Sequence, residues 1–179
     1  AKTNSYVDAP ILGEAETLPT ILFSHGAFGQ LGQNTVLMEE LASHGYAVYS
    51  IQHTGESAAT AFPNGDIIPW DPSIKTVMKT SREANGDYKD AIAKGIGATS
   101  LDERLLGQVD WISRRQNDGE RMISSEKVWV QDRLFIHDTL QNGDVPESVL
   151  DIVAKSNFER TGQIGMSFGG MATGTVCAF

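Results

Sequence analysis

The sequence predicts an α/β fold built on a mostly parallel, doubly wound sheet. The first observation is a continuous apolar run that ends in glycines at residues 20–29 (TILFSHGAFG). The second is an alternation of short strand-like and helix-like segments along the chain. The third is the pentapeptide GMSFG at residues 165–169, which follows a β-compatible segment and precedes a run of small residues. Together these features favour strands joined by right-handed helical crossovers.

The first predicted strand lies in residues 20–29. An uninterrupted apolar run of this length suits a strand that is buried on both faces of a parallel sheet. His25 stands at its end, directly before a glycine. We expect His25 to brace the following loop by hydrogen bonding, although a role as a catalytic base is the alternative.

The next two elements are a helix at residues 35–44 and a strand at residues 46–51. Gly45 stands where a glycine cap is common at helix C-termini. The predicted buried face of the helix consists of Leu37, Met38, Leu41 and Ala42.

Residues 54–125 exceed a minimal crossover and are predicted to form an insertion. Asn64-Gly65 between β-formers indicates a hairpin, and residues 101–115 have the pattern of an amphipathic helix. The polar segment 82–97 is typical of a lid above an active site. A solvated surface excursion without a gating role is an equally good interpretation.

A longer helix is expected from residues 124–125 to 141, ended by Asn142-Gly143. Its predicted buried stripe consists of Val128, Phe135, Ile136 and Leu140. His137 falls off this stripe and is predicted to be solvated. Residues 150–158 form a short helix or turn, and residues 161–164 form the strand before GMSFG.

Ser167 is the candidate nucleophile, because GMSFG has the form G-x-S-x-G of a sharp strand-to-helix turn. Glycines two residues before and after the serine fit this geometry, since side chains there would collide. The motif alone is weak evidence in a glycine-rich chain, but the strand before it and the small residues after it strengthen it. The alternative is a plain Gly/Ser turn.

Three segments resemble a known family: residues 22–28 (LFSHGAF), 51–57 (IQHTGES) and 163–172 (QIGMSFGGMA). They are similar to the α/β-hydrolase superfamily, and most similar to esterases grouped with platelet-activating-factor acetylhydrolases and dienelactone-hydrolase-like proteins. Residues 128–135 resemble a family helix in kind, so the resemblance spans most of residues 20–179.

The resemblance implies a carboxylic ester hydrolase that acts through an acyl-enzyme. Ser167 would be the nucleophile, and the backbone N–H groups of Ala27 and Phe168 would form the oxyanion hole. Phe28 and Met166 would line an apolar rim. Short-chain, lipid-like and polyester substrates are all compatible with it. The alternatives are a non-catalytic α/β-hydrolase-like binding module and an interfacial lipase or phospholipase.

The family places the triad acid and histidine after the nucleophile, and residues 168–179 offer neither. We therefore expect residues 1–179 to be the N-terminal part of a single α/β-hydrolase domain. A C-terminal fragment of the same polypeptide is the expected partner that supplies both residues. A genuine half-protein without hydrolase activity is the alternative.

Composition narrows the function classes only slightly. The chain is 40% hydrophobic and 21% charged, with a net charge of −9, which argues against binding nucleic acid or anionic membrane surfaces. No apolar run is long enough to span a bilayer, and no spacing of ligands suggests a metal, so no cofactor is expected. The single cysteine, Cys177, is predicted to be a buried packing residue, and a disulfide to a cysteine elsewhere in the polypeptide is the alternative. The compartment stays open, with a secreted or periplasmic enzyme as one possibility.

Overall fold

The computed structural model describes residues 3, 5–11, 17–74, 89–116 and 119–178. The chain divides into two compact units. The first contains Ala1–Trp70 and Glu126–Phe179, and the second contains Asp71–Ser125. All of the predicted site residues lie in the first unit.

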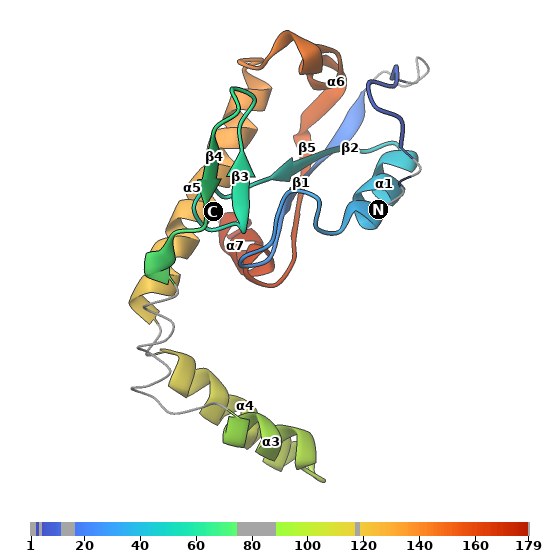
Figure 1. The fold of residues 1–179 in the computed structure, drawn as a ribbon. Coiled ribbons are helices and arrows are strands. Elements are labelled where there is room, and N and C mark those ends of the chain that lie inside the picture. The colour runs from blue at the N-terminus through green and yellow to red at the C-terminus, as the bar shows by residue number, and fades with distance from the viewer. Residues whose placement is uncertain (1–2, 4, 12–16, 75–88, 117–118, 179) are drawn as a thin grey trace. The chain divides into compact units, whose positions relative to one another are not determined.

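The first unit is built on a three-stranded parallel sheet with the order β2-β1-β5. Strand β1 (Leu18–Ser24) lies in the centre, between β2 (Ala47–Ile51) and β5 (Ser156–Gly165). Figure 1 shows the three strands side by side. The fold class predicted from the sequence is therefore confirmed. Because parallel strands end at the same edge, Ser24 of β1 pairs with both Ile51 and Gly165.

Helix α1 (Thr35–Ser43) connects β1 to β2 and ends where the sequence predicted. Gly45 has a φ of 86°, a conformation that glycine adopts without steric cost. The predicted apolar face is only partly covered, because no residue of α1 is buried and the Leu37 side chain is 44% exposed.

The predicted hairpin consists of strands β3 (Ala59–Ala61) and β4 (Ile67–Pro69), which pair antiparallel. Gly65 turns the chain between them with a φ of 91°. This hairpin belongs to the first unit, so the separate unit begins at Asp71. Within the predicted insertion, residues 75–88 and 117–118 lie outside the described residues. A lid role for residues 54–125 stays a prediction.

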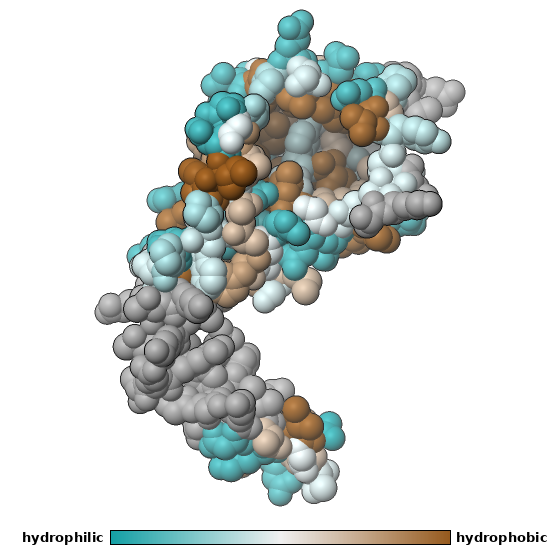
Figure 2. Space-filling model, viewed as in Figure 1, coloured by the Kyte–Doolittle hydropathy of each residue, from teal (hydrophilic) through white to brown (hydrophobic). Residues whose placement is uncertain are grey.

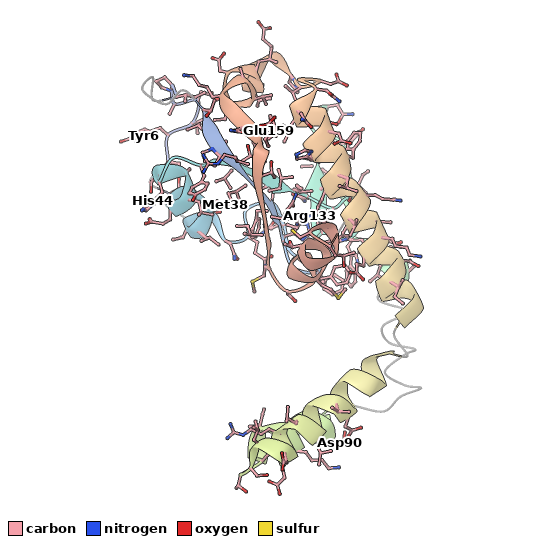
Figure 3. The ribbon with its side chains drawn as sticks, turned by 180° about the vertical axis from the view of Figure 1, so that it is seen from behind. Tyr6, Met38, His44, Asp90, Arg133 and Glu159 are labelled. Atoms are coloured by element: carbon pink, nitrogen blue, oxygen red, sulfur yellow. The ribbon has the colours of Figure 1, made fainter. Side chains whose placement is uncertain are left out.

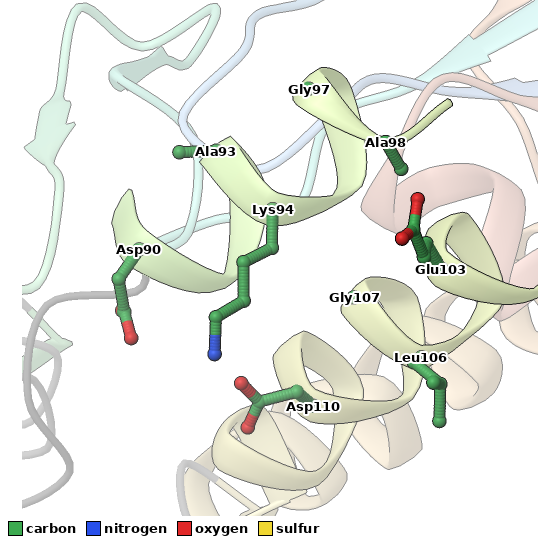
Figure 4. Close-up of a pocket in the computed structure, with 9 residues that line it drawn as sticks. All are labelled: Asp90, Ala93, Lys94, Gly97, Ala98, Glu103, Leu106, Gly107 and Asp110. Atoms are coloured by element: carbon green, nitrogen blue, oxygen red, sulfur yellow. The ribbon is translucent and has the colours of Figure 1, made fainter. Parts of the chain in front are cut away.

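The second unit contains helices α3 (Lys89–Gly97) and α4 (Leu101–Gln116). Helix α4 agrees with the predicted amphipathic helix, whereas the sequence did not indicate α3. Figure 4 shows a pocket between the two helices, with Asp90 and Lys94 on one side and Glu103 and Asp110 on the other. None of the predicted site residues lines this pocket.

Helix α5 (Gly119–Gln141) begins earlier than predicted, and its predicted buried stripe is confirmed for Ile136 and Leu140 but wrong for the other two residues. Val128 is 46% exposed and Phe135 is 67% exposed, although Leu140 is buried. Trp129 and Arg133, each 0% exposed, occupy the buried face instead. The helix is turned this way because both side chains have polar partners inside the unit.

His137 of α5 was predicted to be solvated, and this is wrong. Its side chain is 24% exposed and its ring meets the ring of Phe158 edge-on at 5.9 Å. The prediction failed because Phe158 comes from β5, a contact that the pattern of α5 alone does not reveal.

The chain enters β5 through a 3-10 turn (Glu147–Val149) and helix α6 (Leu150–Lys155). Strand β5 has 10 residues, so it begins earlier than the predicted strand at residues 161–164. Helix α7 (Phe168–Val176) follows β5. Cys177 lies just past the end of α7 and is exposed, so its predicted buried role is wrong.

The core of the first unit joins the sheet to the helices α5 and α6. Leu22, Ile51, Leu140 and Val153 are its buried members. Figure 2 shows further hydrophobic residues gathered in a hollow on one face of this unit. No helix in the described part of the chain is long and apolar enough to cross a membrane.

Candidate active site

Ser167 lies at the turn between β5, which ends at Gly165, and α7, which begins at Phe168. Its backbone has a φ of 52° and a ψ of −112°. Non-glycine residues rarely adopt a positive φ, and such strained residues concentrate at functional sites. The structure thus places Ser167 in the kind of sharp strand-to-helix turn that the sequence predicted.

The two flanking glycines are required by close packing of the backbone. A Cβ atom on Gly165 would lie 2.3 Å from the carbonyl carbon and oxygen of Gly169. A Cβ atom on Gly169 would lie 2.4 Å from the carbonyl oxygens of Ser24 and His25. Backbone atoms in a sheet and its adjoining helix cannot move aside easily, so only glycine fits at either position.

The loop after β1 lies against this turn. A Cβ atom on Gly26 would lie 3.4 Å from the Ser167 Cβ atom and 3.4 Å from the Met166 carbonyl oxygen. The Met166 N–H donates a hydrogen bond of 3.0 Å to the Ser24 carbonyl oxygen. The loop and the candidate nucleophile are therefore neighbours, although Gly26 and Ser167 are 141 positions apart in the sequence.

The backbone N–H groups of the loop after β1 differ in their hydrogen-bond partners. The Gly26 N–H donates to the Gln33 side chain, and the Phe28 N–H donates to the Glu56 carbonyl oxygen at 3.2 Å. Among the described residues, no acceptor is recorded for the N–H groups of Ala27 and Phe168. An oxyanion role for these two N–H groups stays a prediction.

The two predicted rim residues have different surroundings. Phe28 is partly buried and has a φ of 63°, and its ring lies 4.4 Å from the ring of Trp70. Met166 is 44% exposed, directly before Ser167. A role for Phe28 and Met166 in lining the substrate site stays a prediction.

The sequence analysis did not predict a buried chain of hydrogen bonds that lies next to the loop after β1. His53, just after β2, has its Nδ1 atom 2.7 Å from Asp132 Oδ2 and its Nε2 atom 3.0 Å from Ser24 Oγ. This order of serine, histidine and aspartate resembles a catalytic triad. However, Ser24 is 0% exposed and His53 is 1% exposed, so a substrate in solvent cannot reach them. We therefore interpret these buried residues as structural support for the neighbouring turn and loop.

His25 braces the loop, which confirms the prediction. Its Nδ1–H donates to the Gly26 carbonyl oxygen at 2.7 Å, and its Nε2 atom accepts the His53 N–H at 3.2 Å. Burial lowers the pKa of the His25 imidazole. Burial also lowers the pKa of His53, and this effect exceeds the opposing one of Asp132. In both cases burial favours the neutral ring.

Trp129 joins the turn to the histidines. Its indole ring stacks on His53 at 3.8 Å and meets the ring of Phe168 edge-on at 4.8 Å. Its Nε1–H donates to Glu56 Oε2 at 3.0 Å, and the Glu56 carbonyl oxygen accepts the Phe28 N–H. The residue after the candidate nucleophile thus rests on an aromatic ring that is fixed by a hydrogen bond.

The described residues provide no base for Ser167. His25 and His53 are held in the buried chain, His44 bonds to Glu40 at the end of α1, and His137 lies beside Phe158. No hydrogen bond to Ser167 Oγ is recorded within the described ranges. Likewise, no group of three metal-binding side chains occurs among the described residues. The described site therefore contains the exposed Ser167 hydroxyl at the turn, next to the loop after β1.

A parallel sheet, a serine at a strained strand-to-helix turn and an adjoining loop after the central strand are features of the α/β-hydrolase fold. Residues 1–84 match the family model described as platelet-activating factor acetylhydrolase, isoform II. The fold is similar to that of a ferulic acid esterase from Streptomyces cinnamoneus, with a TM-score of 0.56 and 22% identity. No curated protein is similar enough to the chain to count as a match.

The fold similarity covers 95% of this chain but 34% of the esterase, so the chain spans about one third of that protein's length. The family match and the fold match both agree with the similarity to α/β-hydrolase esterases that the sequence motifs indicated. The resemblance predicted from the sequence is thereby confirmed.

Proposed function

We propose that the complete protein is a carboxylic ester hydrolase in which Ser167 is the nucleophile. The observation that carries this proposal is the strained backbone of Ser167, with a φ of 52°, between β5 and α7. The names of the matched proteins, an acetylhydrolase and a ferulic acid esterase, support ester hydrolysis as the reaction class.

The reaction has two steps. Ser167 Oγ attacks the ester carbonyl carbon while its proton passes to a histidine base, and the carbonyl oxygen becomes an oxyanion. The N–H groups of Ala27 and Phe168 stabilise this oxyanion, and each such donor is worth about 2.7–4 kcal/mol in the transition state. The C–O bond to the alcohol breaks, the alcohol takes a proton, and water then hydrolyses the acyl-enzyme.

The histidine and its acid are proposed to come from a C-terminal part of the same polypeptide. Two facts support this source. The four histidines of this chain are engaged or placed elsewhere, and the chain spans only 34% of the esterase with a similar fold. In this proposal residues 1–179 contribute the nucleophile and the oxyanion donors, and the remaining polypeptide contributes the proton transfer.

The proposed substrates are uncharged esters with short-chain, lipid-like or polyester character. The partly buried Phe28 and the exposed Met166 flank the reacting hydroxyl with apolar surface. The net charge of −9 on residues 1–179 opposes the approach of anionic substrates. An apolar, neutral acyl group fits both features.

Rapid mixing of the complete protein with p-nitrophenyl acetate tests the two-step reaction. We expect a burst of p-nitrophenolate equal in amount to the protein, followed by slower steady turnover, because deacylation follows acylation. A protein that binds the ester without any release of p-nitrophenolate would be a non-catalytic binding module. A rate that rises sharply when a longer-chain ester passes its micellar threshold would indicate an interfacial lipase instead.

A further inference from the structure

Arg133 of α5 is fully buried in the first unit, yet its guanidinium contacts no carboxylate among the described residues. Figure 3 labels it inside this unit, whereas Tyr6 and His44 lie at the outside. Burying an arginine costs free energy unless each N–H finds an acceptor. A buried arginine without a carboxylate partner therefore calls for a specific role.

The guanidinium bonds to both strands that carry the site. Towards β1, Nη1 donates to Ser24 Oγ and Nη2 donates to the Leu22 carbonyl oxygen at 3.2 Å. Towards β5, Nε donates to Gln163 Oε1 at 2.9 Å and Nη2 donates to the Ile164 carbonyl oxygen at 3.2 Å. One planar group thus bonds to the last residues of two neighbouring strands.

These strand ends determine where the reacting groups lie. β1 runs into the loop of Ala27, and β5 runs into the turn of Ser167. The two proposed oxyanion donors therefore follow different strands, and their separation depends on how the two strands are aligned at this edge. A shift of about 1 Å between reacting groups can cost roughly 100-fold in rate.

We propose that Arg133 is a positioning residue that fixes the oxyanion loop and the nucleophile turn relative to each other. This inference rests on the proposed function of Ser167. In this proposal Arg133 contacts no reacting atom and acts through its hydrogen bonds to strands β1 and β5.

Arg133 also sets the direction of the hydrogen bonds in the buried chain of Ser24, His53 and Asp132. Ser24 Oγ accepts from Arg133, so the Ser24 hydroxyl donates to His53 Nε2, and His53 Nδ1–H donates to Asp132. The hydrogen bonds therefore run in one direction from a guanidinium to a carboxylate. Burial lowers the pKa of Arg133 to about 10, so the group stays charged at neutral pH. Lysine could not replace it fully, because an ammonium group lacks the planar arrangement of five donors.

The test compares Arg133→Met with Arg160→Met in the complete protein. Arg160 is the matched control, because it lies exposed on β5 and its side chain bonds to none of these strand ends. For each variant, kcat and KM are measured with p-nitrophenyl acetate, and kcat is divided by the concentration of Ser167 that a fluorophosphonate labels. This normalisation removes the effect of unfolded protein.

We expect Arg133→Met to lower the normalised kcat by about 10–100-fold, with KM changed less than about threefold. The rate constant for fluorophosphonate labelling should fall in parallel, because phosphonylation uses the same oxyanion donors. Arg133→Lys should recover part of the loss, and Arg160→Met should match the wild type. A folded Arg133→Met variant with a normalised kcat within about twofold of wild type would overturn the inference.

Gln163→Met decides the question if Arg133→Met does not fold. This variant removes the side-chain acceptor on β5 while leaving the arginine in place. We expect a normalised kcat roughly 3–10-fold lower, and an unchanged value overturns the inference. Failure of the proposed function looks different: wild-type Ser167 itself would then remain unlabelled and the wild-type protein would not turn over the ester.

Discussion

Replacement of Ser167 by alanine is expected to lower kcat for p-nitrophenyl acetate by roughly 10⁴–10⁶-fold in the complete protein. The substitution removes the only atom proposed to form the acyl bond, so only binding and the oxyanion donors remain. The melting temperature should not fall, because no hydrogen bond of the Ser167 hydroxyl is recorded in the described part of the chain. Steady-state kinetics and thermal unfolding of the same samples measure both effects.

Ser43→Ala is the matched control for this substitution. Ser43 is an exposed serine at the end of α1. Its hydroxyl donates to the Glu40 carbonyl oxygen at 2.7 Å and lies 3.3 Å from His44 Nδ1. Its kcat should equal that of the wild type. Residual activity of Ser167→Ala above about 1% of wild type would contradict a nucleophilic role for Ser167.

Gly169→Ala is expected to lower the free energy of unfolding by about 3–5 kcal/mol. The added methyl group would lie 2.4 Å from the carbonyl oxygens of Ser24 and His25. Relief of this overlap would push α7 away from β1 and move Phe168 with it. Activity should therefore be lost in whatever protein still folds. Chemical denaturation gives the free energy of unfolding.

Gly174→Ala provides the control on the same helix. No atom lies within 4 Å of a Cβ atom at Gly174, and the residue has no positive φ. Alanine there should stabilise the protein by about 0.5–1 kcal/mol, because glycine is unfavourable inside helices. Equal effects of the two substitutions would mean that α7 does not pack against β1 as closely as described.

The sequence predicted the turn and the loop well because both are specified locally. An apolar run marks β1, and glycines at positions 165 and 169 mark the two places where backbones come into contact. His25 could be given a bracing role because it stands between a buried strand and a glycine. Each of these features depends on residues close in the sequence.

The supporting network could not be predicted because its members are polar and distant. His53 and Asp132 are 79 positions apart, and Ser24 and Arg133 are 109 apart. The expected stripe of α5 followed apolar residues, whereas Trp129 and Arg133 are buried through partners on β1, β5 and the loop after β2. Hydrophobic periodicity carries no information about such partners.

Strand β5 was predicted too short for a related reason. Its first half contains Asn157, Glu159 and Arg160, which do not alternate with apolar residues as a half-buried strand would. Pairing with Leu18 and Pro19 of β1 extends the strand nevertheless, through a change of register before Thr20. Backbone pairing across the sheet thus outweighed the local sequence preference.

Peptide mapping of the complete protein after reaction with a fluorophosphonate tests the central claim most directly. The probe bonds covalently to an activated serine, and the structure offers two candidates: Ser167 at the strained turn and the buried Ser24 beside His53. We predict a single adduct on the peptide that contains Ser167. An adduct on Ser24, or folded protein without any adduct, would contradict the account.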